Sequence, residues 1–304
     1  AMNDYPIAVD NLVKYYDGRC ILDGINLKIP TGSIYGLLGR NGIGKTTLIR
    51  ILMGLEPPTR GSTSLLGTGS RRLSPAQRGR ISYVAEGHHL IQGMKVGALI
   101  KLCRELSRNW NQTFFDHLIQ TFKLPMDRKV KQLSNGMRAQ LNLALAMAVE
   151  PEVLILDDPT LGLDTIARRQ FLELAIDLLQ RDGRTILFSS HILSDVERIA
   201  DRIGILVGGK LIVDCPQESL KRRIRKLRLI FPDRPPAKLH LTNIIRAETT
   251  GREMILTVAD FDEAQKRLLD TYAPESCSDI PMSLEDIFIE TTGQSTPPLT
   301  SEVA

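Results

Sequence analysis

A glycine-rich loop between an apolar strand and a helix limits the folds open to this chain more than any other feature. Residues 33–39 (SIYGLLG) are typical of a buried strand, residues 39–46 (GRNGIGKT) follow the pattern G-x-x-x-x-G-K-[ST], and residues 45–55 are typical of a helix. In such a loop the glycines let backbone N–H groups turn inward, and the helix N-terminus adds partial positive charge. The order strand, loop, helix predicts an α/β fold with a triphosphate-binding loop, and it disfavours a chance glycine-rich turn.

The residues of this loop are the candidate phosphate ligands. Lys45 is expected to reach the β- and γ-phosphates, and the Thr46 hydroxyl is expected to ligate Mg²⁺. A second apolar strand, residues 153–157, ends in Asp157, and a carboxylate placed there orients Mg²⁺ beside a phosphate loop. The alternative role, a helix N-cap before a proline, suits Asp158 better than Asp157. The predicted nucleotide-binding residues of the loop are Gly39, Asn41, Gly42, Gly44, Lys45, Thr46 and Thr47.

Composition excludes several classes of protein. The chain has 304 residues, 42% of them hydrophobic and 24% charged, which suits one large core and a second small one. It has no apolar run of about 18 residues and no signal-peptide pattern, and its four cysteines match no zinc spacing. The net charge of +4 is local, because residues 221–228 (KRRIRKLR) carry six basic side chains. We therefore expect no nucleic-acid partner.

Periodicity along the chain indicates two folded domains. Up to about residue 221, short apolar strands alternate with helical segments, and a helical layer is expected within 96–148. Beyond it the pattern becomes antiparallel. Strands are expected at 80–85, 153–157, 185–190, 227–231, 244–250 and 252–259, with a hairpin at 202–214 and a helix at 260–269. The predicted organisation is a large α/β domain at 1–221, a small α+β domain at 222–292 and a disordered tail at 293–304.

Four further motifs accompany the phosphate loop and the strand ending in Asp157. They are KYYDG (14–18), LSNGM (133–137), LGLD (161–164) and SSHIL (189–193). In this order, they make residues 6–217 resemble the ATPase domain of ABC transporters. The resemblance implies a P-loop ATPase core with an antiparallel β subdomain and a helical subdomain at about 88–148. It also implies ATPase activity, with ATP and Mg²⁺ as cofactors.

The resemblance assigns roles outside the phosphate loop. Tyr16 would stack on adenine, with Tyr15 as the competing choice and core packing as the alternative for either ring. Ser134 and Gly136 would bind the γ-phosphate held by the other subunit, although Ser134 also suits a simple N-cap. Asp164 would lie at the subunit interface. One phosphate loop and one LSNGM signature per chain thus imply a head-to-tail dimer with two shared ATP sites.

Catalytic roles are implied for Lys45, Asp158 and His191. His191 would hydrogen-bond the γ-phosphate and hold the attacking water or its base. Asp158 departs from the family, which usually has Glu there as general base. Asp has nearly the same reference pKa but is one methylene shorter, about 1.5 Å of reach. Because a misplacement of this size costs on the order of 10²-fold in rate, we expect slow hydrolysis unless the backbone compensates.

A second departure lies in the metal site. The family usually has Gln after the strand YVA, where this chain has Glu86. A carboxylate can still ligate Mg²⁺, although its charge raises the cost of lying near triphosphate without the metal. The predicted metal ligands are therefore Thr46, Glu86 and Asp157.

The resemblance is strongest to ATPases of type-2 ABC exporters, partly because SLEDIF (283–288) closes the appended domain. With no membrane span in the chain, the transport pathway would lie on a separate membrane permease, with this chain on the cytoplasmic face as a homodimer or heterodimer. A regulatory ATP-binding clamp with little hydrolysis and a soluble, non-transport ABC ATPase stay open as alternatives. Residues 221–228 are expected to form a solvated helix and linker. Attraction to anionic lipid or to an acidic partner is the second choice, and binding to nucleic acid is the third.

Overall fold

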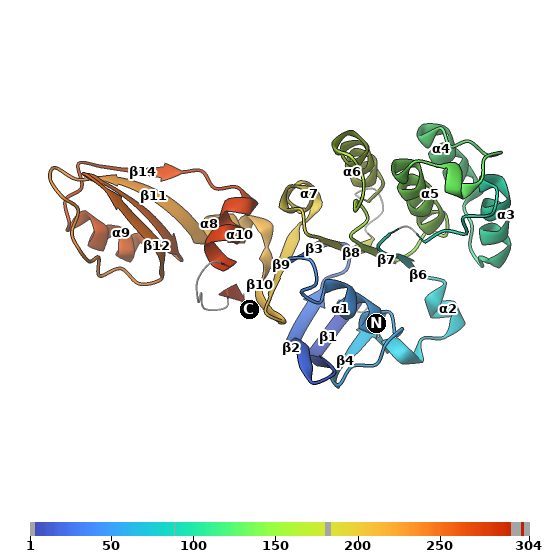
Figure 1. Cartoon of the computed structure of the whole chain (residues 1–304). Helices are drawn as coiled ribbons and strands as arrows, with labels where there is room; N and C mark the ends of the chain where they lie inside the picture. Colours follow the sequence, from blue (N-terminus) through green and yellow to red (C-terminus); the bar gives the residue numbers. More distant parts are fainter. Residues whose placement is uncertain (1–3, 88, 180–183, 293–298, 301–304) are drawn as a thin grey trace. The chain divides into compact units, whose positions relative to one another are not determined.

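The chain divides into two compact units, Ala1–Leu211 and Ile212–Ala304, in a computed structural model (Figure 1). The structure describes residues 4–87, 89–179, 184–292 and 299–300. The division falls after Leu211, whereas the sequence predicts a boundary at 221/222, which lies inside helix α8 (Gln217–Arg223). Of the tail predicted at 293–304, only Leu299 and Thr300 are described, as the short strand β15 (Leu299–Thr300). The other residues of that tail lie outside the described part of the chain.

A parallel sheet forms the centre of the first unit. Its strands follow the order β9-β3-β8-β7-β6, so the strand that precedes the phosphate loop is flanked on both sides. Every residue of β3, β7 and β8 is buried, which explains their uninterrupted apolar sequences. These strands are β3 (Ile34–Leu38), β6 (Ile81–Val84), β7 (Val153–Asp157), β8 (Thr185–Ser190) and β9 (Arg202–Val207). The predicted P-loop-type α/β core is confirmed.

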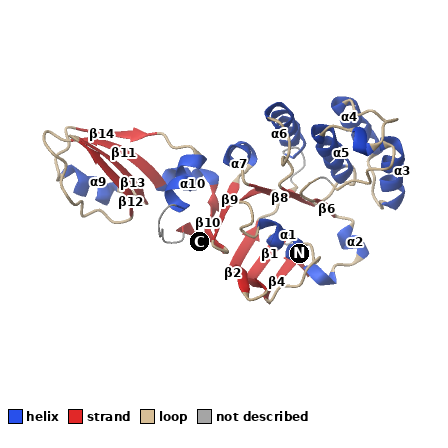
Figure 2. Ribbon diagram, viewed as in Figure 1, coloured by secondary structure: helices blue, strands red, loops and turns tan. Residues whose placement is uncertain are grey.

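An antiparallel sheet, ordered β2-β1-β4-β5, packs with helix α1 (Lys45–Leu52) against one face of the parallel sheet (Figure 2). One hydrophobic cluster joins them, with side chains from both sheets and from α1. The strands are β1 (Ile7–Tyr16), β2 (Arg19–Ile29), β4 (Arg60–Leu65) and β5 (Thr68–Gly69). This core fixes α1, and therefore the end of the phosphate loop, relative to the central strands.

Helices cover the other face of the parallel sheet (Figure 1). Helix α7 (Leu193–Ile199) contacts β3 and β8, and helix α6 (Thr165–Leu179) packs against α5 (Asn135–Met147). The predicted helical layer contains α3 (Val96–Leu106), α4 (Gln112–Phe122), the 3₁₀ turn η2 (Val130–Gln132) and α5. Short helical turns η1 (Ser70–Arg72) and α2 (Pro75–Arg78) precede β6. The layer thus leads directly from the signature sequence into a helix that packs on the core.

The second unit is built around a four-stranded antiparallel sheet ordered β12-β13-β11-β14. Its core is apolar and includes Leu227, Leu229, Leu256, Val258 and the helical residue Leu269. Strand β10 (Lys210–Pro216) spans the division after Leu211, and the elements that follow it are α8, β11 (Ile224–Ile230), β12 (Ile244–Thr250), β13 (Glu253–Ala259), α9 (Glu263–Asp270), β14 (Ser276–Ile280) and α10 (Leu284–Thr292). The sheet and helix α9 have the α+β character expected from the sequence, and β9 and β10 flank the predicted turn at Gly208–Gly209.

The basic segment 221–228 is not the solvated helix and linker expected from its charge. It ends α8 and then forms the first five residues of β11, a central strand of the sheet. Its apolar residues are buried, while its cations form ion pairs across the unit. These pairs are Arg222–Glu218, Arg223–Asp260, Arg225–Asp279, Lys226–Glu290 and Arg228–Glu253. Most of the basic segment is therefore part of a β-strand.

Candidate functional site

The phosphate loop joins β3 to α1, and its backbone depends on glycines with positive φ, Gly42 at 77° and Gly44 at 115°. Gly44 has φ of 115° and directly precedes Lys45, the first residue of α1. A Cβ on Gly44 would come within 2.9 Å of Leu22 Cδ2, so both its backbone and its surroundings require glycine. Asn41 and Gly42 are exposed on the loop, and Thr47 is half-buried on α1. The first N–H groups of α1 therefore open onto the loop, as anion binding needs.

Lys45 lies folded inside its own loop. Its side chain is buried, and Nζ donates to Gly39 O at 2.7 Å and to Arg40 O at 3.3 Å. Burial lowers the pKa of Lys45, while the nearby carboxylates Asp158 and Asp157 oppose that shift. The ammonium is thus held by two neutral carbonyl oxygens, with acidic side chains nearby. Phosphate oxygens, which are charged, would accept stronger hydrogen bonds from it than these carbonyls do.

The two adjacent carboxylates at the end of β7 are both buried, Asp157 at 0% and Asp158 at 4% exposure. Ser189 at the end of β8 organises them: its Oγ donates to Asp157 Oδ1 at 2.7 Å and accepts from Asp158 N at 3.0 Å. Burial raises the pKa of Asp157, and the hydrogen bond from Ser189 opposes that shift. Sequence reasoning missed Ser189, although it lies two residues before His191 in the SSHIL motif.

Two carboxylate oxygens in this site are buried without a hydrogen-bond partner among the described residues: Asp157 Oδ2 and Asp158 Oδ1. A buried anionic oxygen without a partner carries a desolvation cost that a bound cation or water removes. Beside them, Thr46 Oγ1 donates to the exposed Glu86 Oε2 at 3.3 Å. Hydroxyl and carboxylate oxygens are the ligands that Mg²⁺ prefers, so these residues fit the metal.

Thr46, Glu86 and Asp157 line a common cavity of about 490 Å³. Tyr83 also lines it, and burial, followed by the charge of Asp157, raises the pKa of Tyr83 to about 12. The described residues contain no group of three His, Cys, Asp or Glu side chains arranged to hold a metal by themselves. Mg²⁺ usually completes its coordination with water and substrate phosphates, so the site suits a metal that arrives with nucleotide.

His191 and Asp158 form a direct pair. Nδ1 of His191 lies 2.7 Å from Asp158 Oδ2, and the imidazole is partly exposed at the end of β8. Asp158 has φ of 43°, in the left-handed region, and its N–H is bound to both Oγ and O of Ser189. One oxygen of Asp158 therefore orients the imidazole while the other stays unpaired, an arrangement that suits a base and a phosphate-sensing group.

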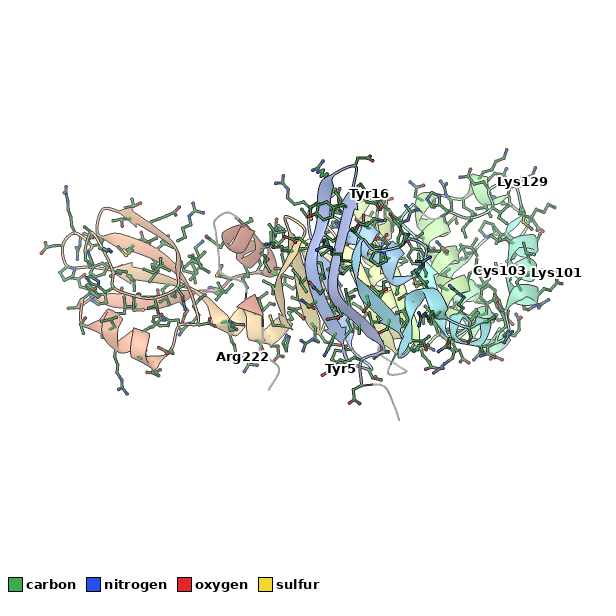
Figure 3. The ribbon with its side chains drawn as sticks, turned by 90° about the horizontal axis from the view of Figure 1, so that it is seen from below. Tyr5, Tyr16, Lys101, Cys103, Lys129 and Arg222 are labelled. Atoms are coloured by element: carbon green, nitrogen blue, oxygen red, sulfur yellow. The ribbon has the colours of Figure 1, made fainter. Side chains whose placement is uncertain are left out.

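Tyr16 stands at the end of β1, far along the antiparallel sheet from Tyr5 (Figure 3). Its hydroxyl donates to Glu56, and Lys14 Nζ lies 4.8 Å from its ring centroid and 2.9 Å from Glu56 Oε1. Burial and Glu56 raise the pKa of Tyr16. Both Tyr15 (46%) and Tyr16 (40%) are exposed, which excludes core packing for either ring. Glu56 and Lys14 thus hold the exposed Tyr16 ring in place.

The signature sequence does not join the phosphate loop in this chain. Ser134 caps α5 by accepting from Met137 N at 3.2 Å, and Gly136 packs so closely that a Cβ would lie 3.1 Å from Ala167 Cβ. Asp164 accepts from Ile166 N and Ala167 N at the start of α6. Ser134 and Gly136 line a different cavity of about 570 Å³, which shares no lining residue with the one beside Thr46.

The strand–loop–helix phosphate site and the carboxylates of β7 define the chain as a P-loop nucleoside triphosphatase. The family model described as ABC transporter matches residues 22–161. The Nod factor export ATP-binding protein I of Neorhizobium galegae is 32% identical, over 97% of this chain and 88% of its own length. The chain belongs to the ABC transporter family, as an ATP-binding subunit with ATPase activity, and the predicted resemblance is confirmed.

Other relatives agree with this assignment. The ABC transporter ATP-binding protein YtrB of Bacillus subtilis is 29% identical over 94% of this chain and 98% of its own. The solved structure of cbiO1 from Clostridium perfringens, part of the ABC transporter complex cbiONQ, is 25% identical with a TM-score of 0.62, covering 72% of this chain and 91% of that chain. Among the described residues, no helix combines the length and apolarity needed to cross a membrane.

Proposed function

We propose that this chain is the ATP-hydrolysing subunit of an exporter and works as a head-to-tail dimer on a separate membrane permease. The observation that carries the dimer is the separation of two half-sites. The phosphate loop, Asp157 and His191 gather at the ends of the parallel strands, while Ser134 and Gly136 line another cavity. A helix N-terminus with a hydroxyl cap binds anions, so a second copy in head-to-tail orientation supplies what each half-site lacks.

The exporter assignment rests on the named relatives. Those include the Nod factor export ATP-binding protein I, which matches over 88% of its own length. In this proposal the chain lies on the cytoplasmic face of the membrane, held by its permease, as a homodimer or heterodimer. Arg223, Arg225, Lys226 and Arg228 form ion pairs with carboxylates of the second unit, so these charges give no support to nucleic acid as a partner.

Each site residue has a role in this proposal. Tyr16 stacks on the base, Gly39 to Thr47 surround the phosphates, and Lys45 leaves its loop carbonyls to bind them. Thr46, Glu86 and Asp157 hold Mg²⁺, which neutralises charge on the phosphate oxygens when bound. Asp158 accepts the proton of the attacking water through its unpaired Oδ1, while His191 stays oriented by Oδ2. Asp164 lies at the subunit interface.

Slow hydrolysis is part of the proposal because Asp158 is short and is already bound to His191. Steady-state turnover of the wild type, Asp158→Glu and Asp158→Asn tests it. We expect Asp158→Asn to lose turnover by about 10²-fold and Asp158→Glu to gain it. Equal turnover of the wild type and Asp158→Asn would mean that Asp158 is not the base. A negligible wild-type turnover with intact dimerisation would favour the regulatory clamp.

Dimerisation is tested with the same variant. Asp158→Asn, which retains bound ATP, should shift to a dimer in light scattering with Mg-ATP and stay monomeric with Mg-ADP. Ser134→Arg, which blocks the signature, should stay monomeric with either nucleotide yet bind ATP normally. A monomeric Asp158→Asn chain in saturating Mg-ATP contradicts the homodimer. Co-purification with membranes rather than ribosomes separates the transport role from a soluble, non-transport one.

A further inference from the structure

A side chain of the signature sequence reaches the loop that contains LGLD, which we call the D-loop (residues 161–164). Asn135 Nδ2 donates to Gly162 O at 3.1 Å, and Asn135 Oδ1 accepts from Arg138 Nη2 at 2.7 Å. The family's LSGGQ signature has glycine at this position, which has no side chain to make either bond. The contact therefore arises from this chain's own departure from the family pattern.

The D-loop leads from Gly162 directly to the catalytic carboxylate. Leu161 N donates to Asp158 O at 3.0 Å, so a tight turn links the residue before Gly162 to Asp158. Asp158 is in turn paired with His191 at 2.7 Å. Gly162 is thus joined to Asp158 through Leu161 and this hydrogen bond, which gives a displacement of the Gly162 carbonyl a short route to the proposed base.

The other end of the D-loop is fixed by packing and capping. Asp164 accepts two N–H groups at the start of α6, at 3.0 and 2.8 Å. Gly136 on α5 approaches Ala167 on α6 so closely that an added Cβ would lie 3.1 Å from its Cβ. Gly162, with φ of 76°, lies between the turn at Asp158 and this fixed helix start. Asn135 is the side chain of the signature sequence that holds it.

We propose that Asn135 is a positioning residue that ties the signature to the D-loop of its own chain. In the proposed dimer the signature serves the partner's nucleotide and Asp158 serves the chain's own. The tether makes these two elements move together and so couples the two ATP sites. The coupling rests on the proposed function, whereas the tether itself is a property of the single chain.

The test compares Asn135→Ala with Asn142→Ala, a matched control on the same helix, in the full chain. Three measurements are made: amide hydrogen exchange of residues 161–164 without nucleotide, ADP affinity, and ATP turnover as a function of ATP concentration. For Asn135→Ala we expect about two- to fivefold faster exchange and a two- to fivefold higher ATP concentration at half-maximal rate. The Hill coefficient should fall towards 1, while ADP affinity and Tm stay unchanged. Asn135→Gln, which keeps the amide donor, should stay within twofold of the wild type.

The outcomes separate the tether from the proposed function. Unchanged exchange in Asn135→Ala overturns the tether, whether or not the chain dimerises. Faster exchange with unchanged half-saturation and Hill coefficient overturns the coupling, provided the wild type dimerises with Mg-ATP. A wild type that neither dimerises nor turns over ATP overturns the proposed function and the coupling together, and the exchange result still decides the tether. A fall in both Tm and ADP affinity in Asn135→Ala would mean that Asn135 only supports the fold.

Discussion

Two buried carboxylates, one in each unit of the chain, differ in how fully the protein supplies their bonding partners. Glu290 in the second unit is 7% exposed, and its oxygens pair with Lys226 Nζ at 3.3 Å and Arg246 Nη1 at 3.8 Å. Asp157 in the first unit is fully buried, yet one of its oxygens has no hydrogen-bond partner among the described residues. One carboxylate is satisfied by the protein, and the other keeps an oxygen that a bound cation would satisfy.

The difference distinguishes a scaffold from a site. A buried charge whose partners are all internal stabilises one arrangement of the chain and gives a ligand nothing to add. A buried charge with an unpaired oxygen weakens the empty fold and gives that free energy back when a cation binds. The same residue chemistry therefore predicts that mutations at Asp157 and Glu290 have opposite effects on stability and on activity.

Asp157→Asn provides the largest expected effect. It should lower Mg-dependent ATP turnover by about 10³-fold, because it weakens the metal site. It should also raise Tm without nucleotide by about 2–4 °C, the shift that about 1 kcal/mol gives in a domain of this size. The sign follows from the raised pKa of Asp157: its favourable contribution is present below its ordinary pKa and is lost as pH rises through the folded value.

Calorimetry at pH 7 and pH 4.5 checks the stability of Asp157→Asn. The gain over the wild type should shrink at the lower pH, where the wild-type carboxyl begins to protonate. A variant less stable than the wild type at pH 7 would contradict the idea that the unpaired oxygen weakens the empty fold.

Glu290→Ala should act in the opposite sense. It leaves Lys226 and Arg246 without their shared partner, so the second unit should lose about 2 kcal/mol of stability, less than for a fully buried pair because both cations reach water. Denaturant unfolding of the full chain measures this loss, with Glu290→Gln as the control for size. ATP affinity should not change. If the free energy of ATP binding fell by as much as the free energy of unfolding, the second unit would contribute to the nucleotide site rather than act as a scaffold.

Ser189→Ala tests whether the site depends on internal pairing at all. It removes the hydroxyl that binds Asp157 Oδ1 and Asp158 N, leaving both groups less satisfied. We expect about a tenfold fall in turnover, from a free-energy loss of about 1–2 kcal/mol. Ser190→Ala is the matched control, since its hydroxyl accepts from Ile192 N at 3.0 Å, a contact outside the two carboxylates. Similar losses in both variants would indicate a general effect on β8.

Arg222→Ala should have the smallest effect. Arg222 and Glu218 form an ion pair on α8 in which both side chains are highly exposed, at 76% and 88%. Such pairs contribute about 0–0.5 kcal/mol, so Tm should move by less than about 2 °C. A larger drop in urea unfolding would show that α8 depends on this pair more than its exposure suggests.

The sequence predicted the local elements around the proposed nucleotide site because the motifs that specify them are short and local. The turn at Gly44, the helix that starts at Lys45 and the carboxylate that ends β7 are each specified within a few residues. The clamp of Ser189 on Asp157 depends on β8 lying beside β7, a pairing of residues that are 32 positions apart. No local pattern encodes such a contact, so the residue that organises both carboxylates could not be recognised.

The basic segment 221–228 failed for a different physical reason. Its charges suggested solvent on all sides, but cations on a strand and at its start can be matched by carboxylates from neighbouring elements. Asp260, Asp279 and Glu290 supply those partners from positions far along the chain. A charge run is therefore weak evidence against a strand where apolar residues recur within it.

The left-handed backbone of Asp158 changes the meaning of its length. Asp and Asn adopt this conformation more readily than most residues, because their short polar side chains interact with the local backbone. At this position reach and conformational ease are opposed: a longer carboxylate approaches the water better and fits the backbone less well. In the proposed mechanism a short base at this position would be a compromise, with slower hydrolysis accompanied by a relaxed turn.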